Sequence, residues 1–326
     1  MICKPYTEDL QSLWDETVKC SRNGTFLFQR NFMDYHKDRF KDASLVFFSD
    51  KGKVVGMLPA CWIEHDTAIA SHGGLTYGGF IIPHHTSLIE VGEMLSLSLK
   101  YYRELGAKCF YYKPIPYIYH REPSEEALYW LFSNGAQLVS RAASQTIDLT
   151  QGELQLSTLR KRKIKRSTTH TPAYSNSPQY LPAYWQLLTD VLKQEHDVKP
   201  VHTLEEITLL QNKFPSNIKL YTCLVNERVE AGVLIFEHEN TAHAQYISAS
   251  RLSRETGLLD ALLYEVILSY QSRGFKYFDF GISTENGGRY LNTGLVFQKE
   301  GFGARTTCYD MYSIALLNHR AINLLQ

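Results

Sequence analysis

Runs of alternating apolar and polar residues occupy two stretches of the chain and predict β-strands. Residues 43–79 and residues 218–250 each read as three consecutive strands separated by polar turns. In both stretches the second strand contains a glycine, Gly56 in one and Gly232 in the other. Strands joined by short turns pair antiparallel, so each stretch predicts a meander.

Each predicted meander is followed by a segment with helical periodicity. Residues 88–106 and residues 258–274 place apolar side chains three and four positions apart, as an amphipathic helix requires. Both segments end at a glycine, Gly106 and Gly274, in the position that favours a helix C-terminus. The sequence therefore predicts one long helix after each meander.

The elements after the two helices also match in order. A strand of buried character comes next, over 108–115 and 276–283, and a short helix with a last strand follows, over 128–141 and 291–306. This repeated order favours an internal duplication over a chance similarity between two α/β domains.

The repeated unit predicts the fold class. A meander followed by one helical crossover gives a mixed, mostly antiparallel sheet flanked by helices, in the α/β (α+β) class. A length of 326 residues suits two domains better than one core. We expect domains at 1–155 and 156–326, with a polar linker over 150–179.

The composition is balanced, with 34 basic and 34 acidic residues, so no overall field favours DNA. The six cysteines form no CxxC pair; we interpret them as reduced core residues and expect no metal site. The N-terminus lacks the apolar region of a signal peptide, and no apolar run reaches the roughly 18 residues of a membrane span. These features predict a cytoplasmic protein without a membrane span.

Six basic residues lie within seven positions of the predicted linker: Arg160, Lys161, Arg162, Lys163, Lys165 and Arg166. Such a cluster suits the phosphates of a nucleotide- or lipid-linked acceptor, of coenzyme A or of transfer RNA. A solvated helix face is the alternative interpretation. We take Arg160, Arg162 and Lys165 as candidate substrate-binding residues.

The stretch from Tyr277 to Ala304 begins as an apolar strand and continues as a glycine-rich polar loop. Asp279 lies within the strand, where a carboxylate is costly unless it is hydrogen-bonded or beside a cleft. Glycines let the backbone approach a ligand closely. We therefore take Ser283 and Arg289 as substrate-binding candidates, and Asp279 and Glu285 as catalytic candidates.

Further candidates lie in segments that combine aromatic, basic and glycine residues, a combination that suits sugars or nucleotides. A plain alternative exists for each: packing of tyrosine-rich strands, or, near His202, a capping box formed by Thr203 and Glu206. The candidate substrate-binding residues are Tyr77, Lys113, Lys199, His202 and Tyr246.

The order of these elements resembles the GNAT acyltransferase fold, and two such units in one chain resemble its Fem-type (FemAB-like) branch. That branch includes aminoacyl transferases of peptidoglycan bridge synthesis. The second half carries the stronger resemblance, in "RETGLLDALLYEVI", "RGFKYFDFGIS" and "GLVFQKEGFGA". The first half, with "GTFLFQRNFMDYHKDRF" and "SHGGLTYGG", resembles members associated with polysaccharide assembly.

The resemblance implies a donor site and a catalytic lysine. Backbone N–H groups at a helix N-terminus would contact the donor pyrophosphate, at Arg254, Glu255, Thr256, Gly257 and Leu258. The family's further small residue is Leu259 here. Lys299 matches the family's Lys-x-x-Phe-Gly, although Gln298 replaces a phenylalanine before it. A lysine there would stabilise the oxyanion of acyl transfer.

The resemblance implies an N-acyltransferase that moves an acyl group from acyl-coenzyme A, such as acetyl-coenzyme A, to an amine. The acceptor would be an amino sugar or another cell-envelope or polysaccharide precursor. The first domain would frame the acceptor and lack a donor site, and no cofactor would be tightly bound. The alternatives are an aminoacyl-tRNA-dependent transferase of the same fold and a non-catalytic glycan-binding protein.

Overall fold

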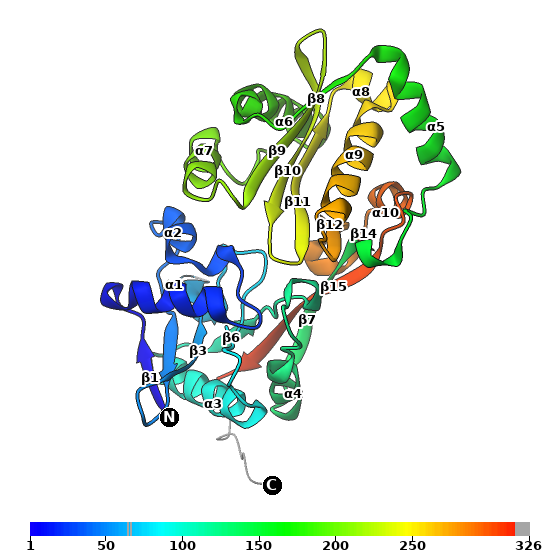
Figure 1. Ribbon diagram of the computed structural model, residues 1–326. Helices are drawn as coiled ribbons and strands as arrows, with labels where there is room; N and C mark the ends of the chain where they lie inside the picture. Colours follow the sequence, from blue (N-terminus) through cyan, green and yellow to red (C-terminus); the bar gives the residue numbers. More distant parts are fainter. Residues whose placement is uncertain (64, 66, 317–326) are drawn as a thin grey trace. The chain divides into compact units, whose positions relative to one another are not determined.

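A computed structural model describes residues 1–63, 65 and 67–316 of the chain (Figure 1). It divides into two compact units. The first comprises Met1–Ala143, Thr284–Leu291 and the described residues from Cys308 onward, and the second comprises Ser144–Ser283 and Asn292–Thr307. Both units are therefore discontinuous in sequence, whereas the expected division was a single boundary after residue 155. The cause is that strands β7 (Gln137–Asp148) and β15 (Arg305–Ala315) each contribute residues to both units.

The first unit contains a three-stranded antiparallel sheet in the order β1-β2-β3 and a further set of strands in the order β4-β5-β6-β15-β7. Within that set β5 and β6 run parallel, whereas β4–β5 and β15–β6 are antiparallel. Its remaining elements are β1 (Ile2–Pro5), α1 (Gln11–Cys20), α2 (Arg30–Met33), β2 (Leu45–Phe48), β3 (Val54–Leu58), β4 (Cys61–Ile63), β5 (Ala68–Ala70), α3 (Leu88–Glu104), β6 (Cys109–Tyr112), α4 (Glu126–Ser133), β13 (Thr284–Glu285) and β14 (Tyr290–Leu291).

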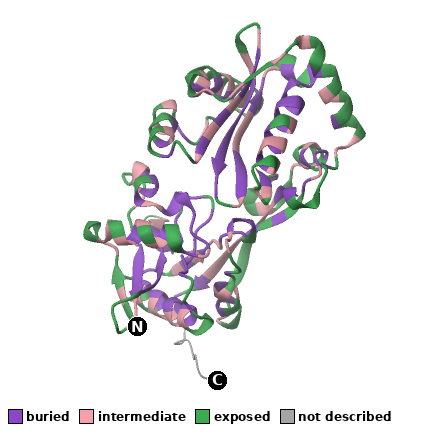
Figure 2. Cartoon of the chain, in the orientation of Figure 1, coloured by how far each residue is buried: buried purple, intermediate pink, exposed green. Residues whose placement is uncertain are grey.

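Helix α3 supplies much of the core of the first unit. A capping box between Ser87 and Glu90 fixes its start, because each side chain accepts a hydrogen bond from the other residue's backbone N–H. Its apolar face, including Met94 and Leu95, packs with strand residues such as Phe110 in one buried cluster. The amphipathic pattern of the sequence therefore determines which face of the helix is buried (Figure 2).

The second unit is a sheet in the order β7-β12-β11-β10-β9-β8, in which β11 and β12 run parallel and the other pairs are antiparallel. Its elements besides β7 are α5 (Thr158–Ser167), β8 (Ala173–Ser175), α6 (Leu181–His196), α7 (Leu204–Lys213), β9 (Ile218–Val225), β10 (Arg228–Glu237), β11 (Thr241–Ala249), α8 (Arg251–Thr256), α9 (Leu258–Ser272), β12 (Tyr277–Ile282) and α10 (Thr293–Glu300).

Helices cover both faces of this sheet, α6 on one side and α9 on the other (Figure 1). Ala231, Val233 and Ile235 of β10 belong to the buried cluster that contains the apolar residues of α9. Gly232 faces α6: a Cβ atom there would lie 2.3 Å from the ring of Tyr184. The alternation of β10 thus serves two cores, and its glycine permits the close approach of α6.

The structure confirms the predicted fold class and both long helices, with Gly106 and Gly274 in the left-handed conformation after their ends. The capping box at Thr203 and Glu206 is also confirmed. The interpretation of all six cysteines as core residues is wrong, because Cys20 and Cys308 are exposed. Among the described helices, none combines the length and hydropathy that crossing a membrane requires.

Candidate active site

A cleft of about 430 Å³ lies within the second unit, where β11 and β12 diverge. The two strands pair up to His243 and Asp279, and β11 then continues to Ala249 without β12 beside it. Apolar side chains form most of the cleft wall: Leu188, Val191, Leu192, Ile247, Ala249, Leu259, Leu263, Phe280, Leu295 and Phe297. The polar groups at the cleft are therefore few and held in a largely apolar surrounding.

Lys299 is one of these polar groups and is almost fully buried, with 7% of its surface exposed. It lies near the end of α10, whose N-cap Asn292 accepts a hydrogen bond from the N–H of Leu295. Its ammonium donates to the backbone oxygens of Gly281 (2.7 Å) and Ile282 (2.9 Å). Burial lowers the pKa of Lys299 to about 8, against a smaller opposite effect of Asp279. The ammonium form still predominates at neutral pH.

Asp279 lies behind this lysine in a fully buried network. One carboxylate oxygen accepts hydrogen bonds from the hydroxyls of Ser144 (2.6 Å) and Thr146 (3.0 Å), and the other lies 2.8 Å from Nδ1 of His243. Asp279 does not line the cleft. The predicted alternatives for this carboxylate were a hydrogen-bonded position or a cleft position, and the structure has the first.

A buried ion pair forms one end of the cleft. Arg160 of α5 donates from Nη1 to Asp260, and Lys163 Nζ lies 3.8 Å from the same carboxylate. Asp260 belongs to the first turn of α9, where the helix dipole stabilises an anion. Nε of Arg160 is buried at the cleft without a hydrogen-bond partner among the described residues. The predicted linker is thus a structural helix with Arg160 buried, while Arg162 and Lys165 are exposed on it and do not line the cleft.

The five predicted donor-contacting residues lie at the junction of α8 and α9. The N–H groups of Arg254 and Gly257 donate to the backbone oxygens of Ser250 and Ser253, and so are already bonded within the chain. Arg254 lines the cleft and pairs with Glu195, whereas Glu255 is exposed and pairs with Arg251 at 2.8 Å.

The other three residues of this group are engaged in packing. Thr256 donates its hydroxyl to the backbone oxygen of Leu252, and Leu258 is fully buried in the core. Gly257 has a φ of 86°, and a Cβ atom there would lie 2.4 Å from the backbone oxygen of Lys163. The glycine is thus required for the contact between α5 and this junction.

His202 and Tyr246 were predicted separately, and the structure brings them together. Nδ1 of His202 lies 2.7 Å from the Tyr246 hydroxyl, and the Tyr246 ring packs edge-on against Trp185. Tyr246 precedes Ile247, a cleft residue on the same strand. Lys199 is exposed, and Ser283 is buried and donates its hydroxyl to the side-chain oxygen of Gln145.

Four predicted residues belong to the first unit. Glu285 and Arg289 are exposed, in the segment that contains β13 and β14. Tyr77 is buried, and Lys113 donates to the backbone oxygen of Leu75 at 2.5 Å. Burial lowers the pKa of Lys113 to about 8. These four lie outside the second unit and its cleft.

Sequence reasoning missed several residues at or beside the cleft. Asp260 carried a usable signal, an acidic residue in the first turn after Gly257. His243 occupies a strand position that alternation alone does not distinguish from a core residue. Ser248, also on β11, has a buried hydroxyl at the cleft with no hydrogen-bond partner among the described residues. Groups of this kind gain most from a polar ligand.

Comparison with protein families identifies the part of the chain that holds the cleft. Residues 157–290 match the family model described as an acetyltransferase (GNAT) domain. The second unit carries a GNAT domain. No curated protein sequence matches the chain.

Solved structures extend the similarity over both units. FemX is 10% identical, with 95% of this chain and 97% of FemX covered and a TM-score of 0.68. L-PGS from Bacillus licheniformis is 12% identical over 99% of this chain and 95% of that one, with a TM-score of 0.62. A tandem GNAT protein from the clavulanic acid biosynthesis pathway is 9% identical over 98% and 99%, with a TM-score of 0.54.

At these identities the similarity concerns the fold. Together with the GNAT domain, it confirms the resemblance to the GNAT superfamily and its Fem-type branch. The divergence of β11 and β12 is thus the divergence of the parallel strand pair of a GNAT domain.

Proposed function

We propose that the chain is an N-acyltransferase that uses the cleft of its GNAT domain to transfer an acyl group from a thioester, acyl-coenzyme A, to an amine. The observation that carries the proposal is the position of Lys299. A mostly protonated ammonium, held by two backbone oxygens, lines an apolar cleft between two diverging strands. A fixed cation in a water-poor site is suited to a developing oxyanion.

The reaction needs little more than positioning and this charge. The amine nitrogen attacks the thioester carbonyl carbon, and negative charge develops on the carbonyl oxygen, which Lys299 would stabilise. The carbon–sulfur bond then breaks, the thiolate leaves and the amine nitrogen releases a proton. Binding both substrates in one cleft converts this into an effectively unimolecular step. Asp279 would act from behind the site, by favouring the charged form of Lys299.

A second donor, aminoacyl-tRNA, is favoured by one group of observations. Two of the N–H groups expected to hold a pyrophosphate are bonded within α8, and the first turn of α9 already contains a paired carboxylate, Asp260. Four cations of α5 are exposed instead: Lys161, Arg162, Lys165 and Arg166. Exposed cations along one helix suit a phosphate backbone. A glycan-binding protein without activity is the third candidate.

The acceptor remains a proposal of the same kind. An amino sugar or another cell-envelope precursor would supply the amine, with the first unit framing it and holding no donor. One of the neighbouring folds is named for a lipid, lysylphosphatidylglycerol, and belongs to a putative synthetase. A lipid-linked amine is therefore included among the acceptors to be tested.

Donor binding is tested by a thermal-shift titration with acetyl-coenzyme A, followed by release of free thiol in the presence of amino-sugar acceptors. Ligand that binds the folded state raises Tm in a dose-dependent way. The matched variants are Gly294→Trp and Gly294→Ala. Gly294 lines the cleft, and a Cβ atom there has its nearest neighbour at an ordinary 3.5 Å.

The indole of Gly294→Trp should fill the cleft and abolish the shift, while Gly294→Ala should retain it. A flat response of the unmodified protein up to millimolar donor would reject acyl-coenzyme A. The same titration with aminoacyl-tRNA would then decide between the second donor and a protein without activity.

A further inference from the structure

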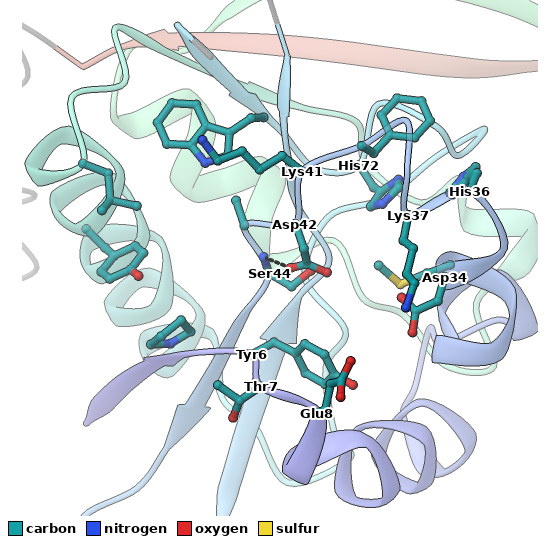
Figure 3. A pocket seen from close by; sticks show the side chains of 17 residues that line it. Tyr6, Thr7, Glu8, Asp34, His36, Lys37, Lys41, Asp42, Ser44 and His72 are labelled. Atoms are coloured by element: carbon teal, nitrogen blue, oxygen red, sulfur yellow. Dashed lines mark hydrogen bonds between the residues drawn. The ribbon is translucent and has the colours of Figure 1, made fainter. Parts of the chain in front are cut away.

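A cavity of about 350 Å³ lies in the first unit, outside the residues that match the GNAT model (Figure 3). It is lined by the end of β1 and the turn after it, the helical turn Asp34–His36, the segment before β2, and the end of α3. The proposed acyl transfer assigns no role to this cavity.

A buried arginine supports the floor of the cavity. Arg30 is fully buried, with its guanidinium 3.3 Å from the ring centroid of Tyr6 and 4.3 Å from that of Trp14. Its Nη1 lies 2.5 Å from a carboxylate oxygen of Asp42 and 3.7 Å from one of Asp34. One cation therefore serves two carboxylates, and both carboxylates line the cavity.

The two carboxylates remain accessible to a ligand. The side chains of Asp34 and Asp42 are 42% and 41% exposed, although Arg30 beneath them is covered. Burial raises the pKa of Asp34, against the opposite effects of Arg30 and Lys37. The floor thus carries one more negative charge than positive charge, at a position where charge is costly without a partner.

A neutral imidazole forms part of the wall. His72 is 4% exposed and stacks parallel to His36, with ring centroids 5.5 Å apart. Burial lowers the pKa of His72 to about 3, so the ring is uncharged at neutral pH. Its Nδ1 is buried without a hydrogen-bond partner among the described residues. This nitrogen is a polar group that a ligand in the cavity can satisfy.

Aromatic rings and long polar side chains complete the lining. Tyr6, Phe40 and Trp62 contribute ring surfaces, while Lys37 and Glu8 are exposed around the opening. Stacking surfaces beside carboxylates, an imidazole and lysines offer both donors and acceptors around an apolar face. Rings that carry hydroxyl groups on their edges and C–H groups on their faces fit such a surface.

We propose that this cavity binds an amino sugar unit, a polyhydroxylated ring that carries a protonated amine. The ammonium pairs with Asp34 and Asp42, the ring face packs on the aromatic wall, and a ring hydroxyl bonds His72. A neutral sugar leaves the excess negative charge unpaired, and a phosphate would meet two carboxylates. Within the described part of the chain, no three histidine, cysteine or acidic residues are grouped to hold a metal ion.

The test is equilibrium binding to the full chain, without any acyl donor, of glucosamine, glucose and N-acetylglucosamine. Calorimetry gives the affinities, and the ¹H–¹³C signal of the His72 ring reports occupancy of the cavity. We expect saturable binding of glucosamine, roughly fivefold tighter than that of the two uncharged sugars, as one ion pair provides. Equal affinity for all three, an unchanged His72 signal, or no saturable binding overturns the proposal.

Asp34→Asn and Asp38→Asn form a matched pair of variants. Asn at position 34 keeps the side-chain shape, and Asp42 still pairs with Arg30, so the fold should be retained with an unchanged Tm. Asp38 is exposed, lies four residues further on and does not line the cavity. Asp34→Asn should remove the preference for glucosamine and Asp38→Asn should keep it; equal effects of the two contradict the proposal. Because no donor is present, failure of the acyltransferase hypothesis would leave this result unaffected.

Discussion

The two units treat the same structural feature in different ways. Each contains one parallel strand pair that ends early, β5–β6 at Ala70 and Tyr111 and β11–β12 at His243 and Asp279. In the second unit a cleft with an apolar wall follows the divergence. In the first unit the chain after β5 continues as a loop that bonds to the end of β6. A GNAT-like strand pair therefore does not by itself provide a ligand site.

The loop in the first unit is fixed by backbone and side-chain contacts. Gly78 N–H donates to the backbone oxygen of Lys113, and Lys113 N–H donates to the hydroxyl of Ser71. A Cβ atom on Gly78 would lie 1.7 Å from the backbone oxygen of Ser71, so only glycine fits. These contacts explain physically why we expect donor binding in the second unit alone.

The largest predicted effect concerns the ion pair at the open cleft, which has no counterpart in the loop of the first unit. Arg160→Met leaves the buried carboxylate of Asp260 without its main partner, although Lys163 remains 3.8 Å away. We expect a loss of about 3–5 kcal/mol in the free energy of unfolding, measured with urea. The double variant Arg160→Met, Asp260→Leu should recover most of this loss; a double variant as unstable as the single one would contradict the assignment.

The next effect compares two buried lysines with similarly lowered pKa values. Lys299→Met should lower kcat/KM for acyl transfer about 10²–10³-fold, as loss of an oxyanion-stabilising group does. The fold should be retained, as judged by circular dichroism. Lys113→Met is the matched control and should change kcat/KM little while lowering Tm, because Lys113 holds the loop through Leu75. Equal loss of activity in both variants would refute a special role for Lys299.

A smaller effect is expected when the loop of the first unit is disturbed. Gly78→Ala should reduce the free energy of unfolding by about 1–3 kcal/mol, because the methyl group must displace backbone. Gly294→Ala, in the open cleft, should change it by less than about 1 kcal/mol. Chemical denaturation of both variants measures the difference, and similar values would show that the loop is not tightly packed.

The smallest effect is a pH dependence of stability from Lys113. Its pKa in the folded state is about 8, below the ordinary value, so the unfolded chain binds more protons above that pH. The stability of the unmodified protein relative to Lys113→Met should therefore rise as pH increases from about 8 toward 10, by the order of 1 kcal/mol. A relative stability that falls over this range would mean that the ammonium is better solvated than its burial indicates.

Periodicity predicted what depends on neighbours in sequence. Helices α3 and α9, and the glycines after them, follow from apolar spacing and C-terminal preferences, and both were located correctly. Lys299 was selected through its resemblance to a family motif, and its burial at a cleft agrees with that choice without establishing its role.

Contacts between distant residues could not be read in the same way. Arg160 and Asp260 are 100 positions apart, and Asp279 meets Ser144 across 135 positions. The basic run therefore looked like a single exposed cluster, although Arg160 is buried and Arg162 is exposed. Tertiary structure decides which of several neighbouring charges enters a core, since the decision depends on a partner that sequence spacing does not reveal.

The strand β15 has a consequence for how the chain is made. Residues 312–315 of this strand pair with β6 in the first unit, although about 200 residues separate the two strands. During synthesis the first unit reaches the ribosome exit without this strand, and β6 waits with an unpaired edge until translation is nearly finished. The half of the molecule that is translated first is therefore the half whose sheet is completed last.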